Sequence, residues 1–208
     1  MKKYLSILIL FLLTNFLYSQ EGFKGGIFIG AVASQVDGDM LMGYNKAGSQ
    51  AGIFLVNKLD DSFGFSMEMK YIQKGSRTNS RAPDSINVAP PRYYKLRLSY
   101  IEVPFLLNFY FKKKFMIETG LGFGYLFRIR EDIGGFGMGP TNPYEKQFRR
   151  FEIPLIFGIA YYPTENIHLD FRASYSALAI RSHPGNQTWY FNRGQYNNLI
   201  SFGIYFNI

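Results

Sequence analysis

The sequence predicts an all-β protein, an eight-stranded antiparallel up-and-down transmembrane β-barrel. Three observations support this: hydrophobic residues recur with a period of two, short and long connections alternate, and aromatic residues and glycine are abundant. The 208 residues include 21 Phe, 16 Tyr and 21 Gly, and 18% are charged, against about 25% in soluble domains. A mean hydropathy of −0.08 is too low for a bundle of membrane helices but suits a barrel with a polar interior.

The composition also excludes several classes of protein. The absence of cysteine excludes a disulfide scaffold, a zinc–thiolate site, an iron–sulfur protein and a lipid-modified N-terminal cysteine. The hydrophobic fraction of 47% is too high for a disordered chain. The length suits one domain.

The first segment, residues 1–20, is predicted to be a secretory signal peptide, which leaves residues 21–208 as the barrel domain. Lys2 and Lys3 precede the apolar run Tyr4–Leu17, and small or polar residues follow, as in an export signal. The alternative is an N-terminal membrane helix, but this run is shorter than the ~20 residues that a spanning helix needs.

Eight segments are predicted as strands because apolar side chains alternate with glycine, polar or charged ones along them. In chain order they are residues 23–33, 50–58, 63–74, 93–110, 115–130, 148–162, 167–176 and 196–208. Representative apolar faces are Ile27 and Ile29 in 23–33; Phe65, Met67 and Met69 in 63–74; Ile101, Val103 and Phe105 in 93–110; Leu121, Phe123 and Tyr125 in 115–130; Leu155, Phe157 and Ile159 in 148–162; Leu169, Phe171 and Tyr175 in 167–176; and Ile200, Phe202 and Ile204 in 196–208.

Two of these strands are less regular. Residues 50–58 are apolar on both faces, so their facing is left open. In residues 93–110, Tyr94, Leu96, Leu98 and Tyr100 form an apolar face, which then changes phase to Ile101, Val103 and Phe105. A phase change inside one strand predicts a β-bulge near Tyr100.

The connections alternate in length along the chain. Short turns are expected at Leu59–Ser62, Phe111–Lys114 and Pro163–Asn166, and long loops at Ser34–Ser49, Gly75–Arg92, Glu131–Gln147 and Ala179–Gln195. All short turns therefore lie at one end, together with both termini, and all long loops lie at the other. Outer-membrane barrels have short periplasmic turns and long extracellular loops.

Which face points inward separates a soluble barrel from a membrane barrel, because the soluble kind has an apolar interior. An eight-stranded barrel has little interior room, so small residues fit inside better than a ring of aromatic ones. The glycines expected inside are Gly120, Gly122, Gly124, Gly158 and Gly203. A candidate interfacial girdle at the short-turn end contains Phe63, Phe109, Tyr110, Phe111, Phe115, Tyr161, Tyr162 and Phe206. The membrane barrel is favoured. The most direct check of this assignment is the direction of two side chains, with Phe123 expected outward and Arg128 inward.

The inward face then carries charged residues, which are expected to form a hydrogen-bonded ionic network that plugs the lumen. They are Lys24, Glu68, Lys70, Lys95, Arg97, Glu102, Glu118, Arg128, Arg130, Arg150, Glu152, Asp170 and Arg172. A structural role is favoured over the alternative of a proton- or ion-conducting path. A wide diffusion pore does not fit this strand number.

Several motifs in combination carry a family resemblance. They are Gly22–Gly26, Ser34–Asp39, Gly43–Gly48, Glu68–Ser76, Tyr100–Pro104 and the glycines at 120, 122 and 124. In this order they resemble the PorT-like outer-membrane β-barrel family, over essentially the whole chain after residue 20. The resemblance implies a barrel of about eight strands in the outer membrane of a Gram-negative cell, a family with one member linked to protein secretion, and no catalytic residues. The chain departs from the usual terminal aromatic, because Ile208 is last and Phe206 is the nearest aromatic residue.

The sequence predicts no catalytic, cofactor-binding or metal-binding residue. His168, Asp170 and Ser174 could suggest a hydrolase, but they share one strand face in a crowded lumen. The second histidine, His183, is expected in an exposed loop. Asp37-Gly38-Asp39 could bind Ca²⁺ through carboxylate oxygens, but these residue types favour a turn. Asn186-Gln187-Thr188 fits a glycosylation pattern that carries no information in a bacterial context.

The formal net charge of +8 does not predict nucleic-acid binding, because many basic residues are expected in the lumen and Lys112-Lys113-Lys114 lie in a turn at the membrane rim. The predicted partners are outer-membrane lipid and proteins that contact the long loops. The prediction is a monomeric, non-enzymatic structural or interaction barrel. The alternatives are an accessory component of a secretion or transport system and a lipid-modifying membrane enzyme.

Overall fold

The structure, a computed structural model, describes residues 22–39, 41, 43–78, 93–112, 114–134, 147–182 and 194–208. The predicted signal peptide, His183 and Asn186-Gln187-Thr188 lie outside these residues. Within the described part of the chain, no helix is long and apolar enough to cross a membrane.

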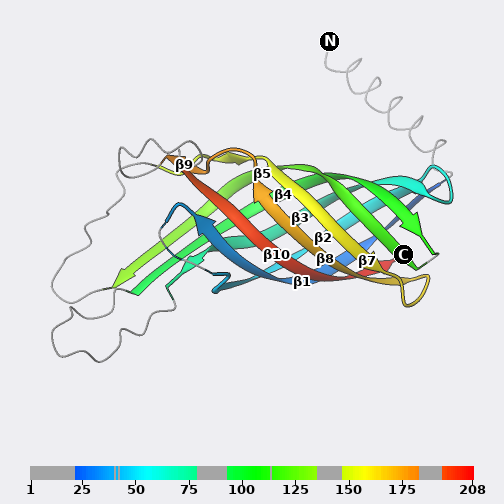
Figure 1. Cartoon of the computed structure of the whole chain (residues 1–208), viewed down its shortest axis with the longest axis horizontal. Coiled ribbons are helices and arrows are strands. Elements are labelled where there is room, and N and C mark those ends of the chain that lie inside the picture. The colour runs from blue at the N-terminus through cyan, green and yellow to red at the C-terminus, as the bar shows by residue number, and fades with distance from the viewer. Residues whose placement is uncertain are drawn as a thin grey trace, which may run out of the picture.

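The described residues form ten β-strands, which make up the wall of an antiparallel barrel (Figure 1). They are β1 (Phe23–Asp37), β2 (Lys46–Lys58), β3 (Phe63–Arg77), β4 (Tyr93–Phe111), β5 (Phe115–Gly134), β6 (Phe151–Glu152), β7 (Pro154–Tyr161), β8 (Ile167–Ser176), β9 (Arg181–Ser182) and β10 (Gly194–Asn207). Both β6 and β7 pair with β5 and are separated only by Ile153, so they occupy one position in the ring. The short β9 pairs only with the start of β10.

The ring has eight positions, and each strand pairs with its neighbour in the chain. The last strand, β10, pairs with β1 from Gly26↔Asn207 to Asp37↔Tyr196, which closes the barrel. The predicted eight-stranded up-and-down barrel is therefore confirmed. In Figure 1 the C-terminus and the short turns that follow β2, β4 and β7 lie at one end, and the strand ends that the long connections join lie at the other.

The strands reach further into the predicted long loops than the sequence pattern indicated. β1 continues to Asp37, β2 begins at Lys46, β3 continues to Arg77 and β5 to Gly134. The polar residues there include Ser34 and Lys46, whose side chains are buried. Polar inward residues look like loop residues in a sequence, although they continue the alternation of a strand.

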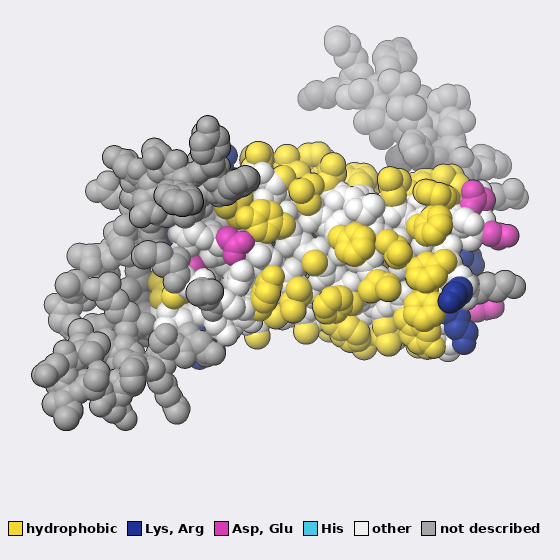
Figure 2. All heavy atoms as spheres, in the orientation of Figure 1, with side chains coloured by type: hydrophobic (Ala, Val, Ile, Leu, Met, Phe, Trp, Pro, Cys, Tyr) yellow, Lys and Arg dark blue, Asp and Glu magenta, His cyan; other side chains and the backbone are white. Residues whose placement is uncertain are grey.

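The apolar faces point outward, as predicted. Phe123 is 57% exposed, and hydrophobic side chains form a broad band around the visible face of the barrel (Figure 2). Exposure of so many large apolar side chains is unfavourable in water and favourable in lipid. The soluble-barrel alternative is therefore wrong.

Arg128 was predicted inward and is instead exposed. The cause is a bulge: Ser99 pairs with Arg128 but Tyr100 pairs with Leu126, so β5 carries one extra residue, Phe127. The predicted bulge near Tyr100 is confirmed in position, but the extra residue belongs to β5 and not to β4. It reverses the facing of β5 beyond Leu126.

The phase change predicted in β4 is wrong. Leu96, Leu98 and Tyr100 are fully buried and share the inward face with Glu102, so β4 keeps one alternation throughout. What changes along the inward face is its chemistry, from charged to apolar. The sequence pattern alone could not distinguish this from a reversal of the faces.

Two further assignments follow from the side-chain directions. In β2, whose facing was left open, Phe54 is buried and Ile53 and Leu55 are exposed. In the predicted girdle, Tyr110 and Tyr162 do not face lipid: they pack with each other inside the turn end of the barrel. Of the other members, Phe63, Phe109, Tyr161 and Phe206 are exposed.

The outward band predicts that a charge introduced at its middle costs more than one at its edge. Phe105 and Phe63 are a matched pair, with 46% and 47% of the side chain exposed. Phe105 pairs with Met67 and Leu121 in mid-strand, whereas Phe63 begins β3. Phe105→Arg should lower the free energy of unfolding by about 2–4 kcal/mol and Phe63→Arg by about 0–1 kcal/mol. Denaturant titration in lipid vesicles measures both, and equal losses would contradict the membrane placement.

Candidate functional site in the barrel interior

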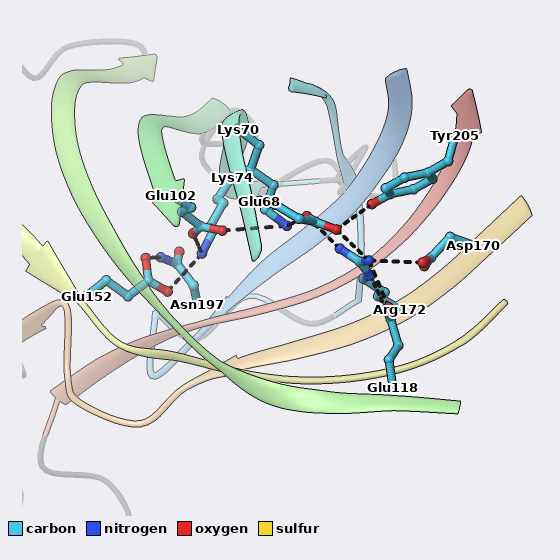
Figure 3. A network of polar contacts seen from close by, with 10 residues as sticks. All are labelled: Glu68, Lys70, Lys74, Glu102, Glu118, Glu152, Asp170, Arg172, Asn197 and Tyr205. Atoms are coloured by element: carbon cyan, nitrogen blue, oxygen red, sulfur yellow. Dashed lines mark hydrogen bonds and ion pairs between the residues drawn. The ribbon is translucent and has the colours of Figure 1, made fainter. Parts of the chain in front are cut away.

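The barrel interior contains buried charged residues from opposite walls (Figure 3). They form two clusters, one around Arg172 and one around Lys74, with Lys70 between them. Strand alternation places them there, because each follows the period of two that turns apolar neighbours toward lipid. All of their side chains are almost completely buried.

The first cluster is centred on Arg172 of β8. Its guanidinium donates two hydrogen bonds to Glu68 of β3, with Nη1–Oε2 at 2.9 Å and Nη2–Oε1 at 2.7 Å. It also bonds to Glu118 of β5 through Nε and Nη2, and Nη2 lies 3.0 Å from Asp170 Oδ2. Tyr205 of β10 donates its hydroxyl to Glu68 at 3.2 Å. Because β3 and β8 lie opposite each other in the ring, Arg172 joins the two walls across the lumen.

The second cluster is centred on Lys74 of β3. Its Nζ lies 2.5 Å from Glu102 Oε1 and 2.9 Å from Glu152 Oε1. Glu152 also accepts hydrogen bonds from Ser176 at 2.6 Å and from Asn197 at 3.0 Å. Both oxygens of this buried carboxylate therefore have partners, which offsets the cost of removing it from water.

Lys70 connects the two clusters. Its Nζ lies 3.9 Å from both Glu68 and Glu102. The network therefore contains five carboxyl groups and three cations. Its components come from β3, β4, β5, β6, β8 and β10, so it ties together most of the wall.

Glycine makes room for this network. A Cβ at position 158 would lie 2.5 Å from Glu118 Oε1 and 2.9 Å from Arg172 Cγ. Gly158 thus leaves the space in which the Arg172–Glu118 pair fits. The predicted role of this glycine in a narrow lumen is confirmed.

Aromatic rings fill the interior toward the turn end. Tyr205 stacks on Phe28 with centroids 4.3 Å apart and on His168 at 4.5 Å, and His168 stacks on Tyr162 at 4.7 Å. A cavity of about 20 Å³ remains between these rings and the Arg172 cluster. That volume suits about one water molecule.

Apolar side chains fill the interior toward the loop end. The cluster consists of Val32, Val36, Ile72, Leu96, Leu98, Tyr100, Leu126, Phe148, Ile180 and Leu199. Arg181 lies over the Phe148 ring at 3.9 Å and bonds to both oxygens of Glu131 at 3.1 and 3.0 Å. The described interior is therefore filled by aromatic rings, then ion pairs, then aliphatic side chains.

Seven of the predicted lumen charges are confirmed as buried, and six are not. The confirmed ones are Glu68, Lys70, Glu102, Glu118, Glu152, Asp170 and Arg172. The others are Lys24, Lys95, Arg97, Arg128, Arg130 and Arg150. Lys24 precedes the first closing pair at Gly26, and Arg150 precedes β6. Lys95 and Arg97 lie on the face opposite Leu96, and Arg128 and Arg130 follow the bulge.

Three buried cations were missed by the sequence analysis. Lys74 is the last residue of the predicted strand 63–74 and continues the alternation of Glu68 and Lys70, so following that alternation to the end of the strand would have found it. Lys46 and Arg181 are also buried. They lay in segments that the sequence analysis treated as loops, and no periodic signal identified them.

His168 and Asp170 are not arranged as the hydrolase hypothesis requires. The Asp170 carboxylate lies against Arg172, and the His168 ring is held between Tyr162 and Tyr205. These contacts differ from the linked nucleophile, base and orienting acid that His168, Asp170 and Ser174 would have to form in a hydrolase. Among the described residues, no group of three or more His, Asp or Glu side chains could hold a metal ion.

The Asp37-Gly38-Asp39 segment forms the predicted turn. Gly38 has a φ of +89°, and Asp39 Oδ1 accepts a hydrogen bond from the Leu41 amide at 2.8 Å. Asp37 accepts hydrogen bonds from Gln35 and Asn198. Burial raises the pKa of Asp39. The two carboxyl groups thus serve the turn and its neighbours.

The chain was compared with known proteins. Residues 14–179, more than half of the chain, match the family described as outer membrane protein beta-barrel domain. No curated protein matches. The narrower PorT-like resemblance stays a prediction.

Solved structures of similar fold come from several bacteria. Neisserial surface protein A is 14% identical, with a TM-score of 0.55, and the match covers 90% of this chain and 100% of that one. Ail, the attachment invasion locus protein of Yersinia pestis, solved with the heparin analogue sucrose octasulfate, is 12% identical over 90% and 99% of the chains, with a TM-score of 0.49. OprG from Pseudomonas aeruginosa is 11% identical over 89% and 94%, with a TM-score of 0.41. At identities this low, the similarity shows a common fold and carries no information about function.

The Arg172 cluster predicts a large and specific loss of stability on removal of its cation. Arg172→Met leaves Glu68, Glu118 and Asp170 without their shared partner, which should lower the free energy of unfolding by roughly 3–5 kcal/mol. Arg97→Met is the control, because its ion pair with Asp132 is partly exposed and such pairs contribute about 0–1 kcal/mol. Denaturant titration compares them, and similar losses would contradict the importance of the buried cluster.

Proposed function

Because the chain belongs to the outer membrane β-barrel family, we propose that it is a non-enzymatic structural and interaction protein with a closed lumen. It lies in the outer membrane, and its four predicted long loops join strand ends that lie at one end of the barrel. In this family of folds the end with long connections faces the exterior of the cell. Partners then contact the loops, and the barrel holds the loops at the membrane surface.

One observation carries this proposal: the Arg172 and Lys74 clusters join opposite walls of the barrel in the middle of the lumen. A conducting path would need a continuous column of water or exchangeable ion sites. The ion pairs, the aromatic rings below them and the aliphatic cluster above them occupy that path instead. The buried charges are therefore proposed to stabilise a plug.

The first twenty residues are proposed to be the export signal that delivers the chain across the inner membrane. The proposal rests on Lys2, Lys3 and the apolar run Tyr4–Leu17. The functional protein is then the barrel domain, residues 21–208.

The closed lumen predicts that the purified protein forms no regular channels in a planar lipid bilayer. A porin inserted into the same bilayers is the positive control. Conductance steps of uniform size that grow with protein concentration would contradict the plug.

A chemical readout tests the same prediction without relying on insertion into bilayers. Because the chain has no cysteine, a cysteine introduced by a single substitution is the one thiol that a reagent can modify. Ser176 is buried beside Glu152 and Ser62 is exposed in a turn. A water-soluble thiol reagent should modify Ser62→Cys rapidly and Ser176→Cys only after unfolding, and equal rates would contradict a sealed interior.

A further inference from the structure

A group of cations lies on the outer surface of the barrel, beyond the apolar band at the loop end. It consists of Arg77 on β3, Lys95 and Arg97 on β4, and Arg128 and Arg130 on β5. We call this group the basic arc. Asp132 is the one carboxylate opposite these residues on the described outer face of β3–β5.

The strand register places like charges directly opposite each other. Arg77 pairs with Lys95, and Arg97 pairs with Arg130. Opposite side chains on one face have Cβ atoms about 4.5–5.5 Å apart, and like charges at such positions destabilise a sheet. One ion pair within the described residues, Arg97–Asp132 at 2.9 Å, compensates part of this charge. Within the described residues the remaining positive charge has no further carboxylate partner on this face, and an anion bound there would neutralise it.

The position of the basic arc matches the level of lipid headgroups. The apolar band ends at Tyr71, Ile101 and Phe127, which face outward next to each other. Ser99 lies two residues beyond Ile101 and pairs with Arg128, which lies one residue beyond Phe127. Arg97 and Arg130 lie two residues further along their strands. At about 3.3 Å per residue, the arc begins where the acyl chains end, on the side of the membrane that carries the long loops.

The opposite wall is different at the same end. There the outer faces of β8, β10 and β1 carry the stacked pair Tyr175–Tyr196, and Asn198 donates to Asp37 at 3.1 Å. These residues are neutral or acidic. The cations therefore mark one side of the barrel, as a binding site does, and do not form a uniform ring around it.

We propose that the basic arc binds the phosphate groups of an anionic glycolipid in the outer leaflet, with the acyl chains packed on Tyr71, Ile101 and Phe127. The planar guanidinium groups of Arg97 and Arg130 can each donate two hydrogen bonds to a phosphate. A lipid fits this surface better than a soluble polyanion because the cations continue directly into an apolar surface. This site is independent of the proposed closed lumen, and either can fail without the other.

The test measures binding of bisphosphorylated lipid A to the detergent-purified protein by native mass spectrometry. The double variant Arg97→Gln/Arg130→Gln should bind roughly tenfold or more weakly, since each lost charge-assisted hydrogen bond weakens binding by about that factor. Lys112→Gln/Lys114→Gln is the matched control, because these lysines are exposed at the turn end. It should bind like the unchanged protein.

Three probes separate the chemistry of the ligand. Dephosphorylated lipid A should bind weakly to all variants, and inorganic phosphate should not compete at millimolar concentration. If a soluble sulfated oligosaccharide binds more tightly than lipid A, the partner is a soluble polyanion and the proposal is wrong. Equal lipid A binding by both double variants would also overturn it.

Thermal unfolding separates loss of the site from loss of the fold. Without lipid, Arg97→Gln/Arg130→Gln should be about as stable as the unchanged protein, because removal of an opposed pair of like charges offsets the loss of the partly exposed Arg97–Asp132 ion pair. With lipid A, the unchanged protein should gain stability and the variant should not. A variant that is less stable without lipid and gains as much with it would contradict the proposal.

Discussion

The structure depends on the closure of the ring by β1 and β10. Within a bilayer each unpaired backbone group costs several kcal/mol, so a sheet can cross only when it has no open edge. The register from Gly26↔Asn207 to Asp37↔Tyr196 supplies this closure. Once eight strands close, the interior is narrow, and every second residue must fit inside it. Gly158 meets this constraint, because it leaves the room that the Arg172–Glu118 pair occupies.

Closure also explains how charges come to be buried in a membrane protein. The inward residues cannot reach lipid, and too little water fits among them to solvate each one. They are instead solvated by one another: Arg172 reaches Glu68 on the opposite wall, and Lys74 reaches Glu102 and Glu152. A buried ion pair is not by itself strongly stabilising, but breaking one is costly. The network therefore favours one arrangement of the walls over others.

Much of the fold could be predicted from the sequence, because alternation is a local signal. Phe123 outward and Glu68, Glu118 and Arg172 inward all followed from a period of two. The failures occurred where the period alone is ambiguous. Leu96 and Leu98 are apolar and still face inward, because the lumen changes from charged to aliphatic along β4. Arg128 was misplaced because one extra residue in its own strand, Phe127 of β5, reverses the facing, and only the pairing with β4 reveals it. The pairing of individual carboxylates with individual cations likewise depends on distances across the lumen, and the strand pattern carries no information about those distances.

The central claim is that Arg172 and Glu68 tie opposite walls of the barrel through the lumen. A double-mutant cycle with Glu68→Gln and Arg172→Gln measures that interaction directly, through the free energies of unfolding of the two single variants and the double variant. We expect a coupling free energy of about 1.5 kcal/mol or more, since the pair is buried and bidentate. Additive effects, within about 0.5 kcal/mol, would contradict it.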